Sequence, residues 1–122
     1  MYKVKVVSNF SAAHFLKNYK GKCEALHGHN WKVEVVVKSN KLSSSGMVID
    51  FGILKNKLNN ILEDLDHKNL NKLNYFKNRN PTSEEIAFYV FSRLKDKLDK
   101  KNIKLEKVKV WETENSCAIY EG

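Results

Sequence analysis

Three of the four histidines in this chain are spaced as ligands of one metal ion. His27 and His29 flank Gly28, and His14 lies upstream at the end of a strand-like run. Residues i and i+2 of a strand point to the same face, so His27 and His29 are expected to project together, while Gly28 allows the backbone to approach closely. Three imidazole ligands that leave a fourth position open are typical of a catalytic zinc site. The spacing therefore predicts metal chemistry, although three imidazoles also accept nickel, cobalt or copper.

Cys23 stands four residues before His27 and is the cysteine nearest to the histidines in the sequence. Its thiolate could act as a base beside a bound metal. Alternatively, it could be a fourth ligand that closes the site, which would make the zinc structural and the chain a non-catalytic binding domain. The second cysteine, Cys117, is expected to be a half-buried strand residue without a chemical role. Two distant cysteines do not form a disulfide framework, so we expect a reducing, cytoplasmic environment.

Two further features carry groups that could do chemistry. Asp66 is followed directly by His67, and a carboxylate beside a histidine can orient the ring for proton transfer. The alternative for this pair is a polar turn that ends a helix. Glu112 shares strand parity with Val108 and Val110, so an acid continues an apolar face. Glu112 is therefore either an exposed edge residue or a carboxylate that accepts hydrogen bonds from the N–H groups of a ligand.

Four strands are expected to position these residues, because apolar and polar residues alternate along them. If the first two strands pair antiparallel, all three histidines lie at one end of one sheet face. The expected strands are residues 2–14, 29–38, 103–113 and 117–121, with a short strand or strand return at 46–50.

Two helices are expected between residues 50 and 102, each with a polar residue at its start. The first runs over residues 51–64 with Asp50 as its N-cap. The second begins at Thr82, which has capping-box spacing to Glu85, and ends near Lys101. One sheet with both helices on one face gives an α+β architecture.

Length and composition indicate a single domain over residues 1–122. No apolar run approaches membrane-spanning length, and the first residues lack the pattern of a signal peptide, so we expect no membrane partner. The formal net charge is +8, but only two of the 22 basic residues are arginine and no aromatic–basic stacking pattern is present. We therefore expect no nucleic-acid partner, and a nucleic-acid-binding module is the alternative. The lysines are expected to form a solvated surface, or to steer an anionic small substrate toward the site.

Six motifs occur in the order found in pterin synthases of the tunnelling fold. They are Phe10–His14 (FSAAH), Cys23–Asn30 (CEALHGHN), Val48–Phe51 (VIDF), Leu65–His67 (LDH), Pro81–Glu84 (PTSE) and Trp111–Thr113 (WET). Over essentially its whole length the chain resembles the 6-pyruvoyltetrahydropterin synthase / 6-carboxy-5,6,7,8-tetrahydropterin synthase superfamily. The resemblance implies the tunnelling fold (T-fold), with an antiparallel four-stranded sheet, two helices on one face and the order ββααββ. It also implies a homohexamer of two stacked trimers with sites at subunit interfaces.

The resemblance also implies a role for each candidate residue. The three histidines would bind Zn2+, and Cys23 would be the general base. Asp66 and His67 would form a proton relay that reaches the site from a neighbouring subunit. Glu112 would anchor the guanidine-like edge of a pterin, and Thr82 and Ser83 would also bind the substrate.

The spacing between Cys23 and His27 favours one branch of this superfamily. A four-residue step is typical of bacterial and archaeal 6-carboxytetrahydropterin synthases, whereas the pyruvoyl-forming enzymes usually have a longer insert. A third branch replaces the cysteine with glutamate and cleaves the side chain of dihydroneopterin. The resemblance therefore implies a lyase that converts 7,8-dihydroneopterin triphosphate and water to 6-carboxytetrahydropterin, acetaldehyde and triphosphate, on the route to queuosine. The alternative is 6-pyruvoyltetrahydropterin synthase, which eliminates triphosphate.

Overall fold

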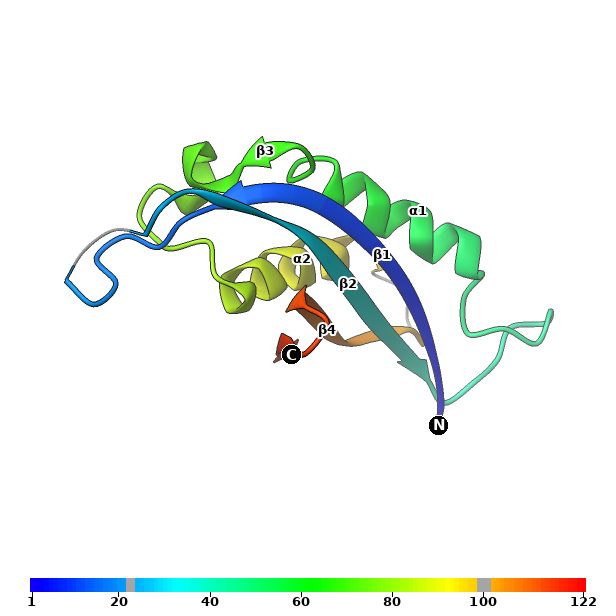
Figure 1. The fold of residues 1–122 in the computed structure, drawn as a ribbon. Helices are drawn as coiled ribbons and strands as arrows, with labels where there is room; N and C mark the ends of the chain where they lie inside the picture. The colour runs from blue at the N-terminus through cyan, green and yellow to red at the C-terminus, as the bar shows by residue number, and fades with distance from the viewer. Residues whose placement is uncertain (22–23, 99–101) are drawn as a thin grey trace.

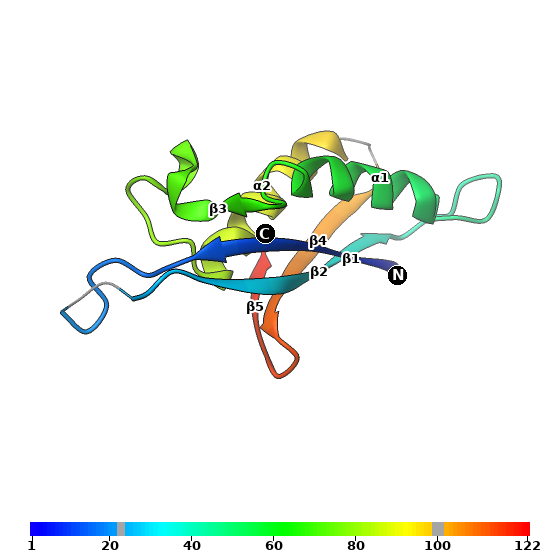
Figure 2. The same ribbon diagram turned by 45° about the horizontal axis from the view of Figure 1, so that its top comes forward.

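The computed structural model describes residues 1–21, 24–98 and 102–122. Its centre is a curved sheet of five strands in the order β3-β1-β2-β4-β5, and Figure 1 shows the long β1 and β2 running side by side. Figure 2 shows α1 and α2 on the same side of this sheet. The strands are β1 (Tyr2–His14), β2 (His27–Ser39), β3 (Lys68–Asn69), β4 (Lys104–Thr113) and β5 (Ser116–Glu121); the helices are α1 (Phe51–Leu62) and α2 (Ser83–Lys97), with 3-10 turns η1 (Leu70–Lys72) and η2 (Asn74–Phe76).

The antiparallel pairing of β1 with β2 brings the histidines together, as the alternation of the sequence predicts. In the register of the two strands, His14 lies opposite His27 and Ala12 lies opposite His29. The same face continues into the core, where Trp31 and Val33 are fully buried against the helices. The prediction that three histidines meet at one end of one sheet face is therefore confirmed.

The predicted four-stranded sheet and ββααββ order are wrong in one detail, because the sheet has a fifth strand. β3 lies between the helices in the chain and pairs in parallel with Ala12 and Ala13 of β1. The backbone reaches this edge through His67, whose φ of 57° lies in the left-handed region and redirects the chain after α1. A strand of two residues has no alternation that a sequence could show.

The predicted strand at 46–50 is also wrong, since these residues form bends without a strand partner. Val48 and Ile49 are nevertheless buried in the core, at 7% and 9% exposure. Their apolar character therefore reflects burial in the core, which periodicity alone does not distinguish from a short buried strand.

Both predicted helix starts are confirmed by side-chain caps. Asp50 accepts a hydrogen bond from the backbone N–H of Ile53, and Thr82 accepts one from the backbone N–H of Glu85. α1 ends at Leu62 and α2 ends at Lys97, with Leu98 as its C-cap, so each helix ends before the predicted position. Lys101, near which the second helix was expected to end, lies outside the described residues.

Two further observations concern the surface. Cys117 is exposed and not half-buried as expected, because β5 forms one edge of the sheet. Within the described part of the chain, no helix combines the length and apolar character needed to cross a membrane.

Candidate metal centre

Four side chains converge where β1 ends, β2 begins and β4 ends. The ligand atoms of His14, His27, His29 and Glu112 all lie within 4.8 Å of one another. The ring centroids of His14 and His27 are 4.7 Å apart, and those of His27 and His29 are 4.8 Å apart. The three histidines of the sequence motif are thus joined by a carboxylate, and this group could hold a metal ion.

Two backbone carbonyls fix which nitrogen of the imidazoles is free. The Nδ1 atom of His14 lies 2.7 Å from the carbonyl oxygen of Pro81, and Nδ1 of His27 lies 2.9 Å from that of Ala25. A carbonyl oxygen can only accept, so in both rings Nδ1 must carry the proton and donate it. This leaves Nε2 with a lone pair in the neutral ring, the arrangement that supporting hydrogen bonds impose on metal-binding histidines.

Glu112 faces two of these imidazoles with the same oxygen. Its Oε1 atom lies 3.2 Å from Nε2 of His14 and 3.0 Å from Nε2 of His29. The His29 nitrogen is buried, and the short approach lacks hydrogen-bond geometry, so this atom has no hydrogen-bond partner within residues 1–21, 24–98 and 102–122. Two nitrogens and a carboxylate oxygen that converge in this way fit a cation placed between them.

The electrostatics of His29 favour the neutral form that a metal requires. Burial lowers the pKa of His29 below its ordinary value, and the neighbouring imidazoles of His14 and His27 act in the same direction, while Glu112 opposes them. A neutral His29 at neutral pH does not have to release a proton before it can bind a cation.

Trp31 forms an apolar floor under the imidazoles. It is fully buried, and its indole N–H donates to the carbonyl oxygen of Ala12 at 3.3 Å. Its ring packs edge-on against His14 and His29, with centroid distances of 4.9 and 5.3 Å. Such a floor keeps water from that side of the site and strengthens electrostatic interactions within it.

Asp66 and His67 form a hydrogen-bonded pair outside the imidazole cluster. Asp66 accepts the backbone N–H of Ser11 at 2.9 Å with one oxygen, and its other oxygen lies 2.9 Å from Nδ1 of His67. The Ser11 N–H, followed by the bond from His67, holds the pKa of Asp66 below its usual value. The His67 side chain is 82% exposed and lines an open hollow of about 490 Å³ together with His29. Both residues lie in the turn that follows α1, as the alternative of a helix-ending polar turn predicted, and within this turn the carboxylate contacts the imidazole.

A second hollow, of about 300 Å³, lies between Glu112 and the start of α2 and is not lined by the histidines. Glu112 and Ser83 line it together with Cys117. The two substrate-binding candidates at the start of α2 differ. Ser83 lines this hollow, whereas the hydroxyl oxygen of Thr82 accepts the backbone N–H of Glu85 as the cap of α2. Cys23, the predicted general base, lies outside the described residues.

One predicted feature of the histidine motif is not supported. A Cβ atom placed on Gly28 would meet only the carbonyl oxygen of Ala12, at the ordinary contact distance of 3.9 Å. The glycine is therefore not required by a close backbone approach within the described part of this chain.

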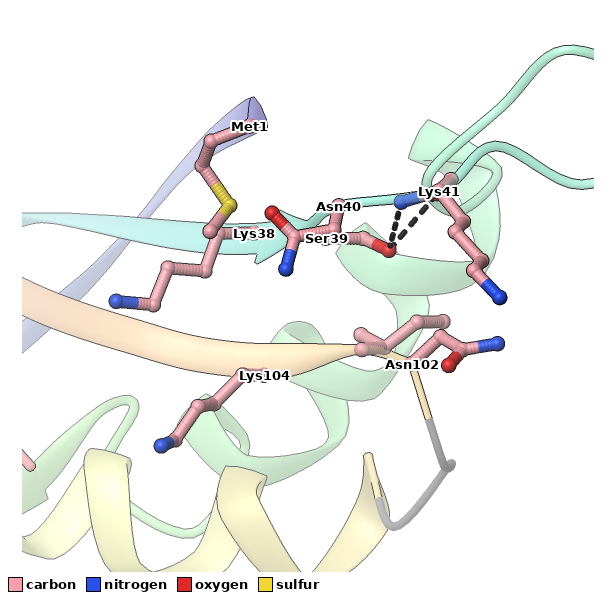
Figure 3. Close-up of a pocket in the computed structure, with 8 residues that line it drawn as sticks. Met1, Lys38, Ser39, Asn40, Lys41, Asn102 and Lys104 are labelled. Atoms are coloured by element: carbon pink, nitrogen blue, oxygen red, sulfur yellow. Dashed lines mark hydrogen bonds between the residues drawn. The ribbon is translucent and has the colours of Figure 1, made fainter.

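A hollow of about 530 Å³ lies at the other end of the sheet, where β1 begins and β2 ends. Figure 3 shows Lys38 and Lys104 on its wall, and these residues are opposite each other in the pairing of β2 with β4. Met1 and Lys41 also line it. None of the predicted site residues does, so this hollow is separate from the imidazole cluster.

Comparisons with known proteins agree with this fold. Residues 3–122 match the model of the family described as 6-pyruvoyl tetrahydropterin synthase. A 6-carboxy-5,6,7,8-tetrahydropterin synthase from Synechocystis sp. is 40% identical, covering 92% of this chain and 87% of the relative. The human 6-pyruvoyl tetrahydrobiopterin synthase is 38% identical, covering 93% of this chain and 87% of the relative. The structure of 6-pyruvoyl tetrahydropterin synthase from Caenorhabditis elegans is similar with a TM-score of 0.85 at 31% identity, covering 99% of this chain and 95% of the other.

Proposed function

Because this chain belongs to the 6-pyruvoyl tetrahydropterin synthase family, we propose that it is a zinc-dependent carbon–carbon lyase of the 6-carboxy-5,6,7,8-tetrahydropterin synthase type. Its reaction converts 7,8-dihydroneopterin triphosphate and water to 6-carboxy-5,6,7,8-tetrahydropterin, acetaldehyde and triphosphate, as a step toward queuosine. The observation that carries this proposal is the cluster of three imidazoles and one carboxylate, in which two of the imidazoles have Nδ1 committed to backbone carbonyls.

His14, His27 and His29 hold the zinc ion in this proposal. Zinc, when bound, would supply a Lewis acid that stabilises negative charge on the substrate. Both His29 and Trp31 suit such a site. The lowered pKa of His29 favours the neutral imidazole that can bind the ion, and the apolar floor of Trp31 keeps water from one side of the ion.

Glu112 is positioned to orient the substrate. One of its oxygens faces His14 and His29, and the residue also lines the hollow that contains Ser83. A pterin in this hollow would donate hydrogen bonds from its guanidine-like edge to the carboxylate, helped by Ser83 and by Thr82 beside it. The side chain of the pterin would then extend toward the imidazoles.

Proton transfer is assigned to Cys23 and to the dyad of Asp66 and His67. The Cys23 thiolate would take a proton from the substrate side chain, and His67, held by Asp66, would exchange the second proton. The high exposure of His67 supports a role at a site completed by another subunit, in a homohexamer built as a dimer of trimers. β5, at one edge of the sheet, offers the unpaired backbone groups through which subunits could join.

The branch within the family rests on the sequence step from Cys23 to His27. The Synechocystis and human relatives differ too little in identity, 40% against 38%, to choose between their activities. The second candidate is therefore the pyruvoyl-forming reaction, which the name of the matching family and the human relative favour.

The test is product analysis of the zinc-loaded protein with 7,8-dihydroneopterin triphosphate, measuring acetaldehyde and the pterin product in the same reaction. Acetaldehyde in equal amount to a 6-carboxypterin supports the proposal. A pyruvoyl pterin without acetaldehyde selects the second candidate. The absence of turnover in protein with full zinc content contradicts both, and a non-catalytic zinc-stabilised domain would then be tested through Cys23→Ala, which should release zinc only if the thiolate is a ligand.

A further inference from the structure

The outer edge of β1 near its end, together with the residues that follow it, is not paired with one long strand. A two-residue strand and several side chains bond to this edge instead. Asp66 and the backbone N–H of His67 engage Ser11, and β3 then pairs with the next two residues of β1. Beyond β3, two asparagine amides continue the series. Asn71 bonds both backbone groups of Phe15, at 2.9 Å each, and Asn80 bonds both backbone groups of Lys17, at 2.7 and 3.1 Å.

These amides replace a strand that the chain does not continue. After β3 the backbone turns into η1 and η2, and the described pairing of β3 with this edge ends at Ala13, before Phe15 and Lys17. A side-chain amide offers the same donor and acceptor as a peptide group, and both asparagines pair with a single residue as a strand neighbour would. Asn71 is buried and Asn80 is half-buried. Both pairs therefore hold the chain just beyond His14.

Asn80 differs from Asn71 because its own neighbour contacts a candidate metal ligand. Pro81 follows Asn80, and the carbonyl oxygen of Pro81 accepts the Nδ1 proton of His14 at 2.7 Å. The segment from His14 to Lys17 is thus bonded at both ends to the dipeptide Asn80–Pro81: His14 bonds to Pro81, and Lys17 bonds to Asn80. The backbone N–H of Thr82 donates to the carbonyl oxygen of Asn80 at 2.9 Å and fixes the turn about Pro81.

We propose that Asn80 is a positioning residue for the metal centre, whose amide holds the Pro81 carbonyl against the His14 imidazole and so fixes the ring with Nε2 toward the metal. The proposal rests on the metal-binding part of the proposed function and not on the reaction catalysed. Loss of a group that hydrogen-bonds a metal-binding histidine directly typically changes metal affinity by about 10- to 100-fold, and because Asn80 acts through the Pro81 carbonyl, the lower end of this range is expected for it. In the wild type the hydrogen bond to Pro81 orders the His14 imidazole before the metal binds. Without that hydrogen bond, metal binding itself must order the imidazole, and this lowers the metal affinity.

The test compares Asn80→Ala with Asn78→Ala, a control at an exposed asparagine of the same connection. Zinc and cobalt affinities are measured by chelator competition on the full chain, under conditions in which circular dichroism shows each metal-free variant to be folded. Asn80→Ala should weaken both metals by about 10-fold, and the visible absorption spectrum of the cobalt form should change, because it reports ligand geometry. Asn78→Ala should match the wild type. Unchanged affinity, within twofold, and an unchanged spectrum in Asn80→Ala would overturn the proposal.

Two further variants separate positioning from general support of the β1 edge. Asn80→Asp keeps the acceptor for Lys17 but loses the donor, and it replaces Asn80→Ala in the comparison if the latter does not fold. Asn71→Ala removes the more deeply buried amide, so it should lower the unfolding temperature more but the metal affinity less than Asn80→Ala. The reverse order of affinities would show that only the edge matters and would overturn the proposal. Because no turnover is measured, a protein without lyase activity can still pass this test.

Discussion

Oε1 of Glu112 lies 3.0 Å from Nε2 of His29, a buried nitrogen that makes no hydrogen bond to any residue the structure describes. The same oxygen lies 3.2 Å from Nε2 of His14, to which it is hydrogen-bonded, and the other nitrogen of His14 is already committed to a carbonyl. The His29 nitrogen is thus left without a partner, and a cation placed among the three groups could bind all of them. This relationship is the basis for treating the cluster as a metal centre.

His29→Ala should lower zinc affinity by more than the 10- to 100-fold that losing a supporting residue costs, because the substitution removes a proposed ligand. His67→Ala is the matched control, since it also removes an imidazole but one that is exposed and outside the cluster. Chelator competition should give wild-type affinity for His67→Ala, and turnover should be lost in both variants. Full zinc affinity in His29→Ala would contradict the ligand assignment.

The metal-free protein should lose stability as the pH falls below about 6.5, the ordinary pKa of histidine. Burial lowers the pKa of His29 in the folded state, so the unfolded chain binds a proton at a pH where the folded chain does not. The free energy of unfolding therefore decreases as the pH falls through this window. Urea unfolding at pH 7.5 and pH 5.5 measures the decrease, and His29→Gln should show a smaller one. An equal decrease in both proteins would argue against the shift at His29.

Asp66 should stabilise the protein above the pH range in which carboxylates titrate. Its pKa in the folded state is lowered, chiefly by the backbone N–H of Ser11, so its contribution is present at neutral pH and is lost as the pH falls through the lowered value, below about 3.9. Asp66→Asn keeps an acceptor for Ser11 but does not titrate. The difference in unfolding free energy between wild type and Asp66→Asn should therefore shrink between pH 5 and pH 2. A constant difference would contradict this interpretation.

Much of the fold could be predicted because its long elements have strong periodicity. β1 and the first part of β2 largely alternate, although residues 33–37 of β2 are buried without a break, and the caps Asp50 and Thr82 mark both helix starts. β3 could not be predicted, since its pairing depends on a positive φ at His67 that no local pattern demands. The apolar run at Val48 does not form a strand, because burial and not strand pairing determines its apolar character.

The site was predictable at the level of side chains that carry chemistry and not at the level of their support. Histidine spacing and strand parity place His14, His27 and His29 together, whereas the parity of Glu112 with Val110 indicated only an apolar strand face and not that its carboxylate joins the histidines. The carbonyl of Pro81 that fixes the tautomer of His14 has no sequence signal, because every residue carries a carbonyl group. The same holds for the amide pairs made by Asn80, which depend on tertiary contacts between segments far apart in the chain.

Gly28→Ala should be tolerated by the folded chain. The added methyl group meets only an ordinary contact at 3.9 Å, and Gly28 does not have a positive φ, so unfolding free energy should change by no more than about 1 kcal/mol. Denaturant unfolding measures the change in unfolding free energy, and chelator competition shows whether zinc affinity is kept. Loss of turnover with unchanged stability and zinc content would assign the glycine to contact with the substrate or a neighbouring subunit. A strong loss of stability would contradict the geometry at Ala12.

The most direct measurement of the central claim is X-ray absorption spectroscopy at the zinc edge of the zinc-loaded protein. An open site held by imidazoles should show nitrogen and oxygen ligands at about 2.0–2.2 Å, with outer-shell scattering from three rings and no sulfur. Wild type and Cys23→Ala should then give the same spectrum. A sulfur ligand at about 2.3 Å that disappears in Cys23→Ala would show a closed site in which the thiolate binds the metal, and would contradict the catalytic account.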